Sequence, residues 1–410
     1  MQPSPTEKSY TSCPLDHTML AQQKTARVTE PASAAIERAA DGVWHVRNFA
    51  AARAILRRSD TKQAGFKAEL LERLPRVINL PLLYQEGKQH HQQRKQIARF
   101  FTPKTVSEHY RHMMETLADQ LIARLQHARR ADLSQLSMAL AVRVAGEVIG
   151  LTDSLLPGMD RRLNAFFSGG EIPFSWHPRA LASFFHSQLR LAFFFCLDVK
   201  PAIQARRRKS REDIISHLIA QGYRNSEILT ECVMYSAAGM VTTREFICIA
   251  AWHLLEQPAL RAQFLGAAEA ERYQMLHEIL RLEPVVGHLY RRTTADLHLT
   301  SKNISITIPQ GDLIDVHIYA VNADEAVVGA HPFTICPGRE IHVDRVAPSV
   351  MGFGDGHHRC LGEFIAIQET DIFLQRLLAL DSLRIERAPS LHWDDTLATY
   401  ELRDFIIALD

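Results

Sequence analysis

The stretch that decides the fold of this 410-residue chain is 353–362, which reads FGDGHHRCLG. Gly354 and Gly356 stand close together, which indicates a backbone with unusual dihedral angles or one that lies against a flat group. Cys360 comes directly before the apolar segment 361–380, which we predict to be a helix. A helix N-terminus offers N–H groups and the positive end of a dipole. Both lower the pKa of a thiol and favour the thiolate, the form of cysteine that binds metals.

A buried free cysteine beside a glycine-rich turn would be the ordinary interpretation of a lone cysteine. The whole stretch, however, resembles the haem-binding signature of the cytochrome P-450 family, F-G-x-G-x-[H/R]-x-C-x-G. The matching residues are Phe353, Gly354, Gly356, His358, Cys360 and Gly362. The resemblance implies haem b (iron protoporphyrin IX), with Cys360 as the iron ligand, Phe353 beside the sulfur and His358 hydrogen-bonded to a propionate.

A second motif, E-x-x-R, is formed by Glu278 and Arg281, which lie three residues apart on a predicted helix and within reach of an ion pair. On its own such a pair is most often a solvated surface pair. In the family it is buried and held by another arginine from the loop before the cysteine. Arg339 and Arg345 are both candidates for that arginine. We expect a structural network, because losing one member of a buried charged set is costly.

Three basic residues resemble the family's contacts with the haem propionates. His90 and Arg94 are four residues apart on a predicted helix, so both project to one side. Phe-Thr-Pro at 101–103 favours this register over one that begins at His91. Arg291 stands at the family's offset from the E-x-x-R motif, and its guanidinium suits a carboxylate. Each of these side chains, taken alone, would be expected to face solvent. The three together imply a site that binds the propionate carboxylates of the haem.

Residues 235–243, YSAAGMVTT, lie in a long apolar segment that we predict to be helical. Ala238, Gly239 and Thr242 resemble the family's [A/G]-G-x-[D/E]-T-[T/S]. This implies that Ala238 borders the haem and that Gly239 and Thr242 act in dioxygen activation. Without the cysteine motif, the small residues would indicate close helix packing. We expect the Thr242 hydroxyl to distort the helix. The usual acid before this threonine is replaced by Val241, which cannot relay protons.

The pattern along the chain predicts a mainly α protein with a smaller β-rich part, which by resemblance is a single large domain with the cytochrome P-450 fold. Residues 1–30 are polar and interrupted by proline, and we expect a loosely attached extension before a catalytic domain at 31–410. Apolar residues at three- and four-residue spacing predict helices over 88–285. A further helix is expected near 50–57, a functional loop at 322–359, and strands at 43–46, 297–299, 304–308, 313–318 and near the C-terminus.

The charge balance and the cysteines limit the partners. Lys and Arg number 47 and Asp and Glu 46, so no overall field attracts nucleic acid or acidic lipid. The basic cluster at 206–209 is interpreted as a solvated helix end. Arg244 is interpreted as a member of a salt bridge on a helix surface. The first thirty residues contain no secretory segment or membrane anchor. Six scattered cysteines without a C-x-x-C pair fit a reducing compartment. We expect a cytoplasmic protein.

Aromatic residues are concentrated between 160 and 200, where the family forms a lid over its substrate pocket. They imply a sizeable apolar or aromatic substrate. Segments 74–84, 285–289 and 397–399 are further wall candidates by resemblance. Basic residues on the cysteine side, near Lys95, Arg99 and Arg359, indicate where a redox partner docks. The aromatic residues are Phe166, Phe167, Phe174, Trp176, Phe184, Phe185, Phe193, Phe194 and Phe195.

The resemblance spans roughly residues 40–405 and implies a haem-thiolate monooxygenase of the bacterial type, acting in secondary metabolism. Such an enzyme inserts one oxygen atom from dioxygen into an apolar small molecule, with electrons from NAD(P)H through a ferredoxin and its reductase. One alternative is atypical haem-thiolate chemistry, either peroxide-driven oxidation or oxidative coupling, which Val241 keeps open. The other is a haem binder or sensor without turnover, against which Thr242 and the aromatic residues argue.

Overall fold

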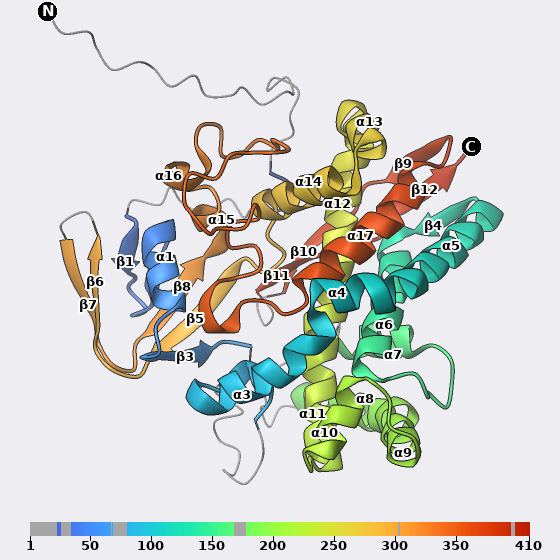
Figure 1. Cartoon of the computed structure of the whole chain (residues 1–410), viewed down its shortest axis with the longest axis horizontal. Helices are drawn as coiled ribbons and strands as arrows, with labels where there is room; N and C mark the ends of the chain where they lie inside the picture. Colours follow the sequence, from blue (N-terminus) through green and yellow to red (C-terminus); the bar gives the residue numbers. More distant parts are fainter. Residues whose placement is uncertain are drawn as a thin grey trace, which may run out of the picture.

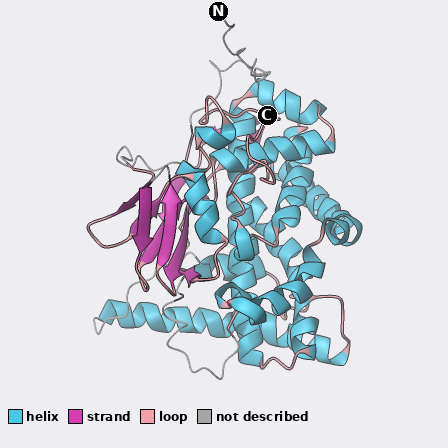
Figure 2. Ribbon diagram, turned by 60° about the vertical axis from the view of Figure 1, so that its left-hand side comes forward, coloured by secondary structure: helices cyan, strands magenta, loops and turns pink. Residues whose placement is uncertain are grey.

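A five-stranded sheet and a much larger set of helices lie side by side in this protein (Figure 1). Seen from another direction, the sheet occupies one side and the helices the other (Figure 2). This computed structural model describes residues 23–25, 34–66, 68, 80–167, 178–301, 304–394 and 398–410. The predicted class, mainly α with a smaller β-rich part in one domain, is confirmed.

The five-stranded sheet has the strand order β1-β2-β8-β5-β3. Strands β2 and β8 pair in parallel, and all other neighbours are antiparallel. Helix α1 (Phe49–Leu56) covers one face, where Val46, Ile314 and Val316 form a core with its apolar side chains. Strands β6 (Leu297–Ser301) and β7 (Ile304–Ile308) form a separate hairpin. The sheet strands are β1 (Ile36–Arg38), β2 (Trp44–Val46), β3 (Thr61–Ala64), β5 (His288–Thr293) and β8 (Leu313–His317).

The helical part is built around one long helix, which runs as α11 (Asn225–Ser236), a π-helical turn (Ala237–Val241) and α12 (Thr242–Glu256). Helix α12 packs against α6, α14 and α17, so its side chains are almost all buried. The other long helices are α3 (Gly87–Ile97), α5 (Arg111–Ala128), α6 (Leu133–Ile149), α7 (Met159–Phe167), α8 (Pro178–Phe194), α9 (Lys200–Arg208), α10 (Ile214–Ala220), α13 (Pro258–Gly266), α14 (Glu269–Leu282) and α17 (Glu363–Leu378).

Shorter elements complete the chain. Strand β12 (Ile406–Leu409) lies between β4 (Arg130–Asp132) and β9 (Leu383–Arg387), and β10 (Ser390–Asp394) pairs with β11 (Thr399–Arg403). The remaining turns of helix are η1 (Leu82–Tyr84), η2 (Ala98–Phe101), α4 (Pro103–Thr105), η3 (Val106–Tyr110), η4 (Phe195–Val199), α15 (Ile318–Val321), α16 (Glu325–Val328) and η6 (Gly356–His358). The expected loop at 322–359 therefore contains only short helical turns.

Residues 23–25 are attached to the helical part, so the prediction of a loosely attached extension is wrong for them. The backbone N–H groups of Lys24 and Thr25 donate to the Glu283 carboxylate at 2.6 and 3.0 Å. His253 approaches the same carboxylate at 2.9 Å. Glu283 is fully buried just after α14, and a buried carboxylate must be paired. This requirement explains why the segment is held.

Arg206 contradicts the interpretation of 206–209 as a solvated helix end. Its side chain is buried, and its guanidinium pairs with Asp213 at 2.5 Å and also with Asp153. The sequence shows a run of basic residues but not the acids that the fold brings to one of them. None of the helices that the structure describes is long and apolar enough to cross a membrane.

We predict that Thr25→Val destabilises the protein by about 1.5–3 kcal/mol, the range for losing a hydrogen bond to a charged group. The Thr25 hydroxyl donates to Glu283, and valine keeps its shape but not the donor. The measurement is chemical denaturation of the purified protein. Thr230→Val, at an exposed threonine, is the control. Equal, small changes in both variants would show that the attachment contributes no stability.

Candidate active site

The cysteine segment forms a tight loop against the end of α1. The Cys360 N–H donates to the Phe353 carbonyl at 2.9 Å, which closes the loop. Gly356 has φ +70°, and a Cβ there would lie 2.1 Å from the carbonyl oxygen of Leu56. Only glycine fits this position, because it alone tolerates both the dihedral angle and the close approach. The second glycine of the motif thus fixes the distance between the loop and α1.

Cys360 lies where the sequence predicted, just before α17 and two residues before its N-cap, Gly362. The N–H of Gly362 favours the thiolate, but burial dominates and raises the pKa of the thiol. The expected lowering of this pKa by the helix N-terminus is therefore outweighed by desolvation. The residue keeps accessible surface. Metal binding removes the thiol proton, so an iron ion would supply the charge that burial disfavours.

His90, Arg94 and His358 gather beside this loop. The His90 and His358 rings lie 4.3 Å apart, and Arg94 donates to the Arg359 carbonyl at 2.5 Å. His90 is buried, and neither of its ring nitrogens has a hydrogen-bond partner in the part of the chain that the structure describes. Desolvation lowers the pKa of His90 to about 4. A buried imidazole with two orphaned nitrogens requires a partner that protein groups do not supply here.

Glu86 joins the same cluster and was missed in the sequence. Its carboxylate lies 3.2 Å from the His358 Nε2 and 4.0 Å from the Arg291 guanidinium, and it accepts the Gln63 N–H at 2.8 Å. Arg291 in turn donates to the Gln63 side chain at 2.8 Å. Glu86 is the N-cap residue of the helix that carries His90. An acidic residue four positions before His90 was the available signal.

These residues fit a haem. The cluster combines a thiol suited to iron, an orphaned buried imidazole and two arginines, of which Arg291 is almost fully buried. Guanidinium groups pair with carboxylates in fixed geometry. A macrocycle that carries two propionates would provide the acceptors that Arg94, Arg291 and His90 need. Leu289, a predicted wall residue, lies 3.6 Å from the position of a Cβ on Gly354.

The long central helix is distorted where the sequence predicted. The π-helical turn at Ala237–Val241 precedes Thr242, whose hydroxyl donates to the Ala238 carbonyl at 2.5 Å. Ala238 is exposed, and Gly239 and Thr242 are partly exposed. A Cβ on Gly239 would lie 3.6 Å from Ala145 of α6, so this glycine also packs against that helix. All three residues of the motif therefore keep accessible surface.

Val241 is fully buried and offers no polar group. The nearest acid along the helix, Glu245, is engaged: it accepts from Arg244 at 2.6 Å and from the Leu402 N–H and Arg403 at 2.7 Å each. Arg244 is buried, so its interpretation as a surface ion pair is wrong. The fold encloses the pair between α12 and β11, which the local sequence does not reveal.

Glu231 is a second acid on the central helix that the sequence reasoning missed. It is buried on α11 and accepts a hydrogen bond from Gln93 of α3 at 3.1 Å. Burial raises its pKa to about 7. The carboxyl group therefore holds a proton for part of the time near neutral pH. An acid within an apolar helix was the available signal.

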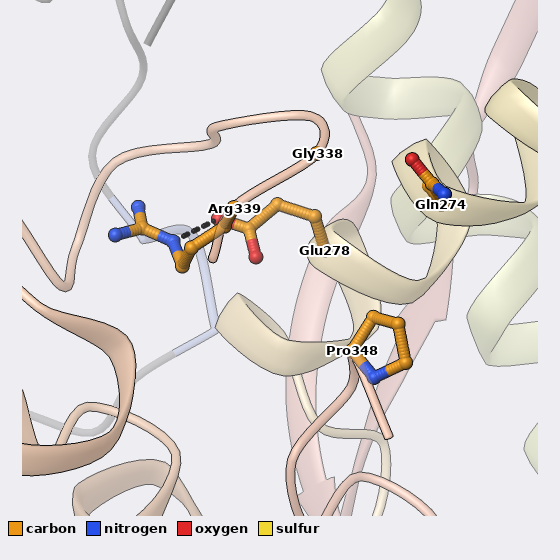
Figure 3. Close-up of a pocket in the computed structure, with 5 residues that line it drawn as sticks. All are labelled: Gln274, Glu278, Gly338, Arg339 and Pro348. Carbon is orange, nitrogen blue, oxygen red and sulfur yellow. Dashed lines mark hydrogen bonds and ion pairs between the residues drawn. The ribbon is translucent and has the colours of Figure 1, made fainter. Parts of the chain in front are cut away.

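Glu278 is the centre of a buried charged network. Arg281 donates to its two oxygens at 2.7 and 2.9 Å. Arg339 donates to the same carboxylate at 2.8 Å (Figure 3). Arg281 also donates to the carbonyls of Asn322 and Pro332. Arg339 thus completes the network, whereas Arg345 is exposed. The small pocket of Figure 3 lies against this network and is lined by Gln274, Glu278, Gly338, Arg339 and Pro348.

The aromatic residues of the expected lid divide into different environments. Phe194 is in the core, whereas Phe185 and Phe193 are 64% and 52% exposed. The Phe166 and Phe167 rings meet edge to face at 5.0 Å. Phe195 packs against the core. Outside the described residues or side chains lie Phe174, Trp176, Phe184 and wall segments 74–79 and 397.

A sequence profile described as cytochrome P-450 matches residues 273–388. Among curated proteins, the chain is 26% identical over 381 residues to the biotin biosynthesis cytochrome P-450 of Bacillus subtilis, covering 88% of this chain and 86% of that protein. It is also 26% identical over 314 residues to the mycinamicin IV hydroxylase/epoxidase of Micromonospora griseorubida, with coverage of 74% and 73%.

Solved structures show the same fold. A mutant of P-450 EryK in complex with erythromycin B superposes with a TM-score of 0.73 at 20% identity, covering 92% of this chain and 93% of that chain. The structure of P-450 BioI in complex with an acyl carrier protein that carries hexadec-9Z-enoic acid gives a TM-score of 0.71 at 20% identity, with coverage of 90% and 93%.

We predict that Glu278→Ala yields little folded, haem-loaded protein, because two buried guanidinium groups lose their carboxylate. Removing one partner of a buried pair typically costs about 3–5 kcal/mol. The measurements are soluble yield, haem content and chemical denaturation.

The matched comparison is Arg339→Ala against Arg345→Ala, since the two arginines lie in the same loop and only Arg339 contacts Glu278. Arg339→Ala should lose stability and Arg345→Ala should not. Full haem loading with selective loss of turnover in Glu278→Ala would contradict a structural role.

Proposed function

Because the chain belongs to the cytochrome P-450 superfamily of haem-thiolate monooxygenases, we propose that it inserts one oxygen atom from dioxygen into a sizeable apolar small molecule. The observation that carries the proposal is Cys360, which keeps accessible surface, beside a basic cluster in which neither ring nitrogen of His90 has a partner among the described residues. Electrons would come from NAD(P)H through a ferredoxin-type protein and its reductase.

In this proposal haem b is held at two points. Cys360 binds the iron, and Phe353 packs on the core beside it. His90, Arg94, Arg291 and His358 hold the propionates. Bound haem supplies the oxygen and electron chemistry that no side chain of the protein provides. The backbone of Gly354, Gly356 and Gly362 shapes the loop that presents the thiol.

Ala238, Gly239 and Thr242, which keep accessible surface, border the site of oxygen chemistry. The Thr242 hydroxyl donates to the Ala238 carbonyl, and a rotation about its Cα–Cβ bond redirects that donor. Val241 supplies no proton, and Glu245 is fully engaged by Arg244 and Arg403. Proton delivery therefore depends on Thr242, with water, backbone groups or the substrate in the place of the usual acid.

The proposed substrate is a large, mostly apolar product of secondary metabolism. The mycinamicin IV hydroxylase/epoxidase acts, by its name, on such a compound, and the EryK mutant holds erythromycin B. Leu289 beside the cysteine loop and the aromatic residues of α7 and α8 supply apolar surface. A screen for ligand-induced shifts of the Soret band would identify the substrate.

The proposed docking surface for the redox partner lies on the cysteine side. Lys95 and Arg99 are exposed on and just after α3, the helix that carries His90 and Arg94. Arg359, next to Cys360, pairs with Glu363 at 2.6 Å and remains 36% exposed. Such a surface suits an acidic partner. Free thiols among the described cysteines are typical of a reducing compartment, and we infer a cytoplasmic location.

A second candidate function is atypical haem-thiolate chemistry, either peroxide-driven oxidation or oxidative coupling. The observation that favours it is Val241, buried where the family usually has an acid. Peroxide already carries the protons that dioxygen must acquire, so an enzyme that uses it has less need of a relay.

We predict that Cys360→Ala abolishes the strongly red-shifted Soret band of the reduced, carbon monoxide-bound protein, because only a thiolate ligand produces it. Cys196→Ala and Cys336→Ala, at the other described cysteines that are not buried, are the controls and should keep the band. An unchanged red-shifted Soret band in Cys360→Ala would contradict the assignment of Cys360 as the iron ligand.

We predict that Thr242→Ala lowers the product formed per NADPH consumed by up to about a hundredfold, the lower end of what a positioned proton-transfer group contributes. Thr242→Ser, which keeps the hydroxyl, should stay near wild type. With peroxide in place of dioxygen, the two variants should differ much less.

The companion variant Val241→Asp restores the usual acid, and Val241→Asn matches its size without the charge. Val241→Asp alone should raise the yield per NADPH. If the wild type converts substrates without polar groups at full yield, and neither substitution changes it, water alone delivers the protons and Val241 only shapes the pocket.

A further inference from the structure

A cluster of metal-ligating side chains lies on the five-stranded sheet, on the face opposite α1. In the parallel pair β2–β8, His45 is opposite Asp315, and in the antiparallel pair β5–β8, His288 is opposite His317. Asp315 and His317 are two residues apart on β8, so they point to the same face. The register therefore places all four side chains together, away from the apolar face of Val46, Ile314 and Val316.

The donor atoms are close enough to share one ion. The His45 Nδ1 lies 2.7 Å from the His317 Nε2. These nitrogens lie 3.4 and 3.3 Å from the Asp315 Oδ2. Zinc binds nitrogen and oxygen donors at about 2.0–2.2 Å, so tetrahedral geometry separates two of its donors by about 3.3 Å. Two of the three separations match this value, and a small ring rotation widens the third.

The chemistry of the donors selects the ion. Two imidazoles and one carboxylate suit Zn²⁺ and neighbouring divalent transition metals, whereas Ca²⁺ and Mg²⁺ prefer oxygen donors alone. The three side chains are 20%, 7% and 18% exposed, which leaves a path for the ion.

The remaining neighbours support the same set. The His288 Nδ1 lies 2.9 and 3.0 Å from the two Asp315 oxygens and holds this carboxylate in place, as outer-shell groups do in metal sites. The neighbouring strands β2 and β8 carry the three donors and β5 carries His288, so the backbone of one sheet fixes their spacing. The positive charge of Arg47 acts on His317, but Arg47 is paired with Glu37 at 2.7 Å.

We propose that His45, Asp315 and His317 form a binding site for a divalent transition metal, with Zn²⁺ the best match and His288 as the residue that positions Asp315. The site is separate from the cysteine loop, which packs against α1 on the other face of the sheet. It does not depend on the proposed monooxygenase function. Its role is to lock three strands together, since the ligands come from β2 and β8 and the supporting histidine from β5.

The test measures zinc in the purified haem-loaded protein. After treatment with a chelator, the protein is dialysed against buffered Zn²⁺ together with a chromophoric competitor, and bound zinc is counted by mass spectrometry. We expect one tightly bound Zn²⁺ per chain and a higher melting temperature with zinc than without it. Absence of tight binding in the wild type would overturn the proposal.

Matched double variants separate this site from general histidine binding. His45→Gln/His317→Gln should weaken zinc binding by about a hundredfold or more. His298→Gln/His392→Gln removes two exposed histidines elsewhere and should leave binding unchanged. Equal affinity in the two double variants would mean that the zinc binds adventitiously. The carbon monoxide spectrum of each variant reports whether the fold is intact.

Asp315→Asn gives a second route if the double variant folds poorly. It keeps the size of the side chain and both histidines but removes the charged ligand, so zinc binding should weaken by at least about tenfold. Unchanged binding in this variant would contradict the site as proposed. If zinc affinity falls while the carbon monoxide spectrum stays normal, the metal site exists independently of the haem.

Discussion

The buried carboxylate of Glu278 is the constraint on which the rest of the site depends. It accepts from Arg281 of its own helix, from Arg339 and from the Cys336 N–H. A buried charge is tolerated only when its hydrogen-bonding positions are filled, so these partners must be present together. The network therefore fixes α14 to the loop at 336–339. The chain then continues into the cysteine loop, whose distance from α1 is fixed by Gly356.

Positive charge near the cysteine is balanced unevenly. Glu86 lies close to His358 and Arg291, while Arg94 bonds to a backbone carbonyl and His90 has no partner among the described residues. Burial lowers the pKa of Arg94 and of Arg291, which measures the cost of keeping these cations away from water. In the proposed function, a bound group with two carboxylates would relieve that cost. We infer that protein stability and haem affinity would then be coupled through the same residues.

Much of the fold could be predicted because strong local patterns agree with it. The apolar spacing of 88–285 gave helices, and the predicted strand at 304–308 is β7 without a shift. Strands such as β1, β3 and β5 were not predicted, because they mix polar with apolar residues. They exist through pairing with distant segments. Likewise Thr25 and Glu283 are 258 residues apart in the sequence, so no local sequence pattern predicts their contact.

By itself, the sequence determined the cysteine loop, the order of the motifs and the distorted helix segment at 238–242, because each is encoded in a few neighbouring residues. The tertiary structure alone showed that Arg339, and not Arg345, completes the network around Glu278. It also showed that Arg206 and Arg244 are buried and that Glu86 lies close to His358. It alone also assembled His45, Asp315 and His317. A sequence does not distinguish a solvated charged residue from a buried one. The pKa values, ion-pair partners and ligand geometry of these residues depend on what the fold packs around them.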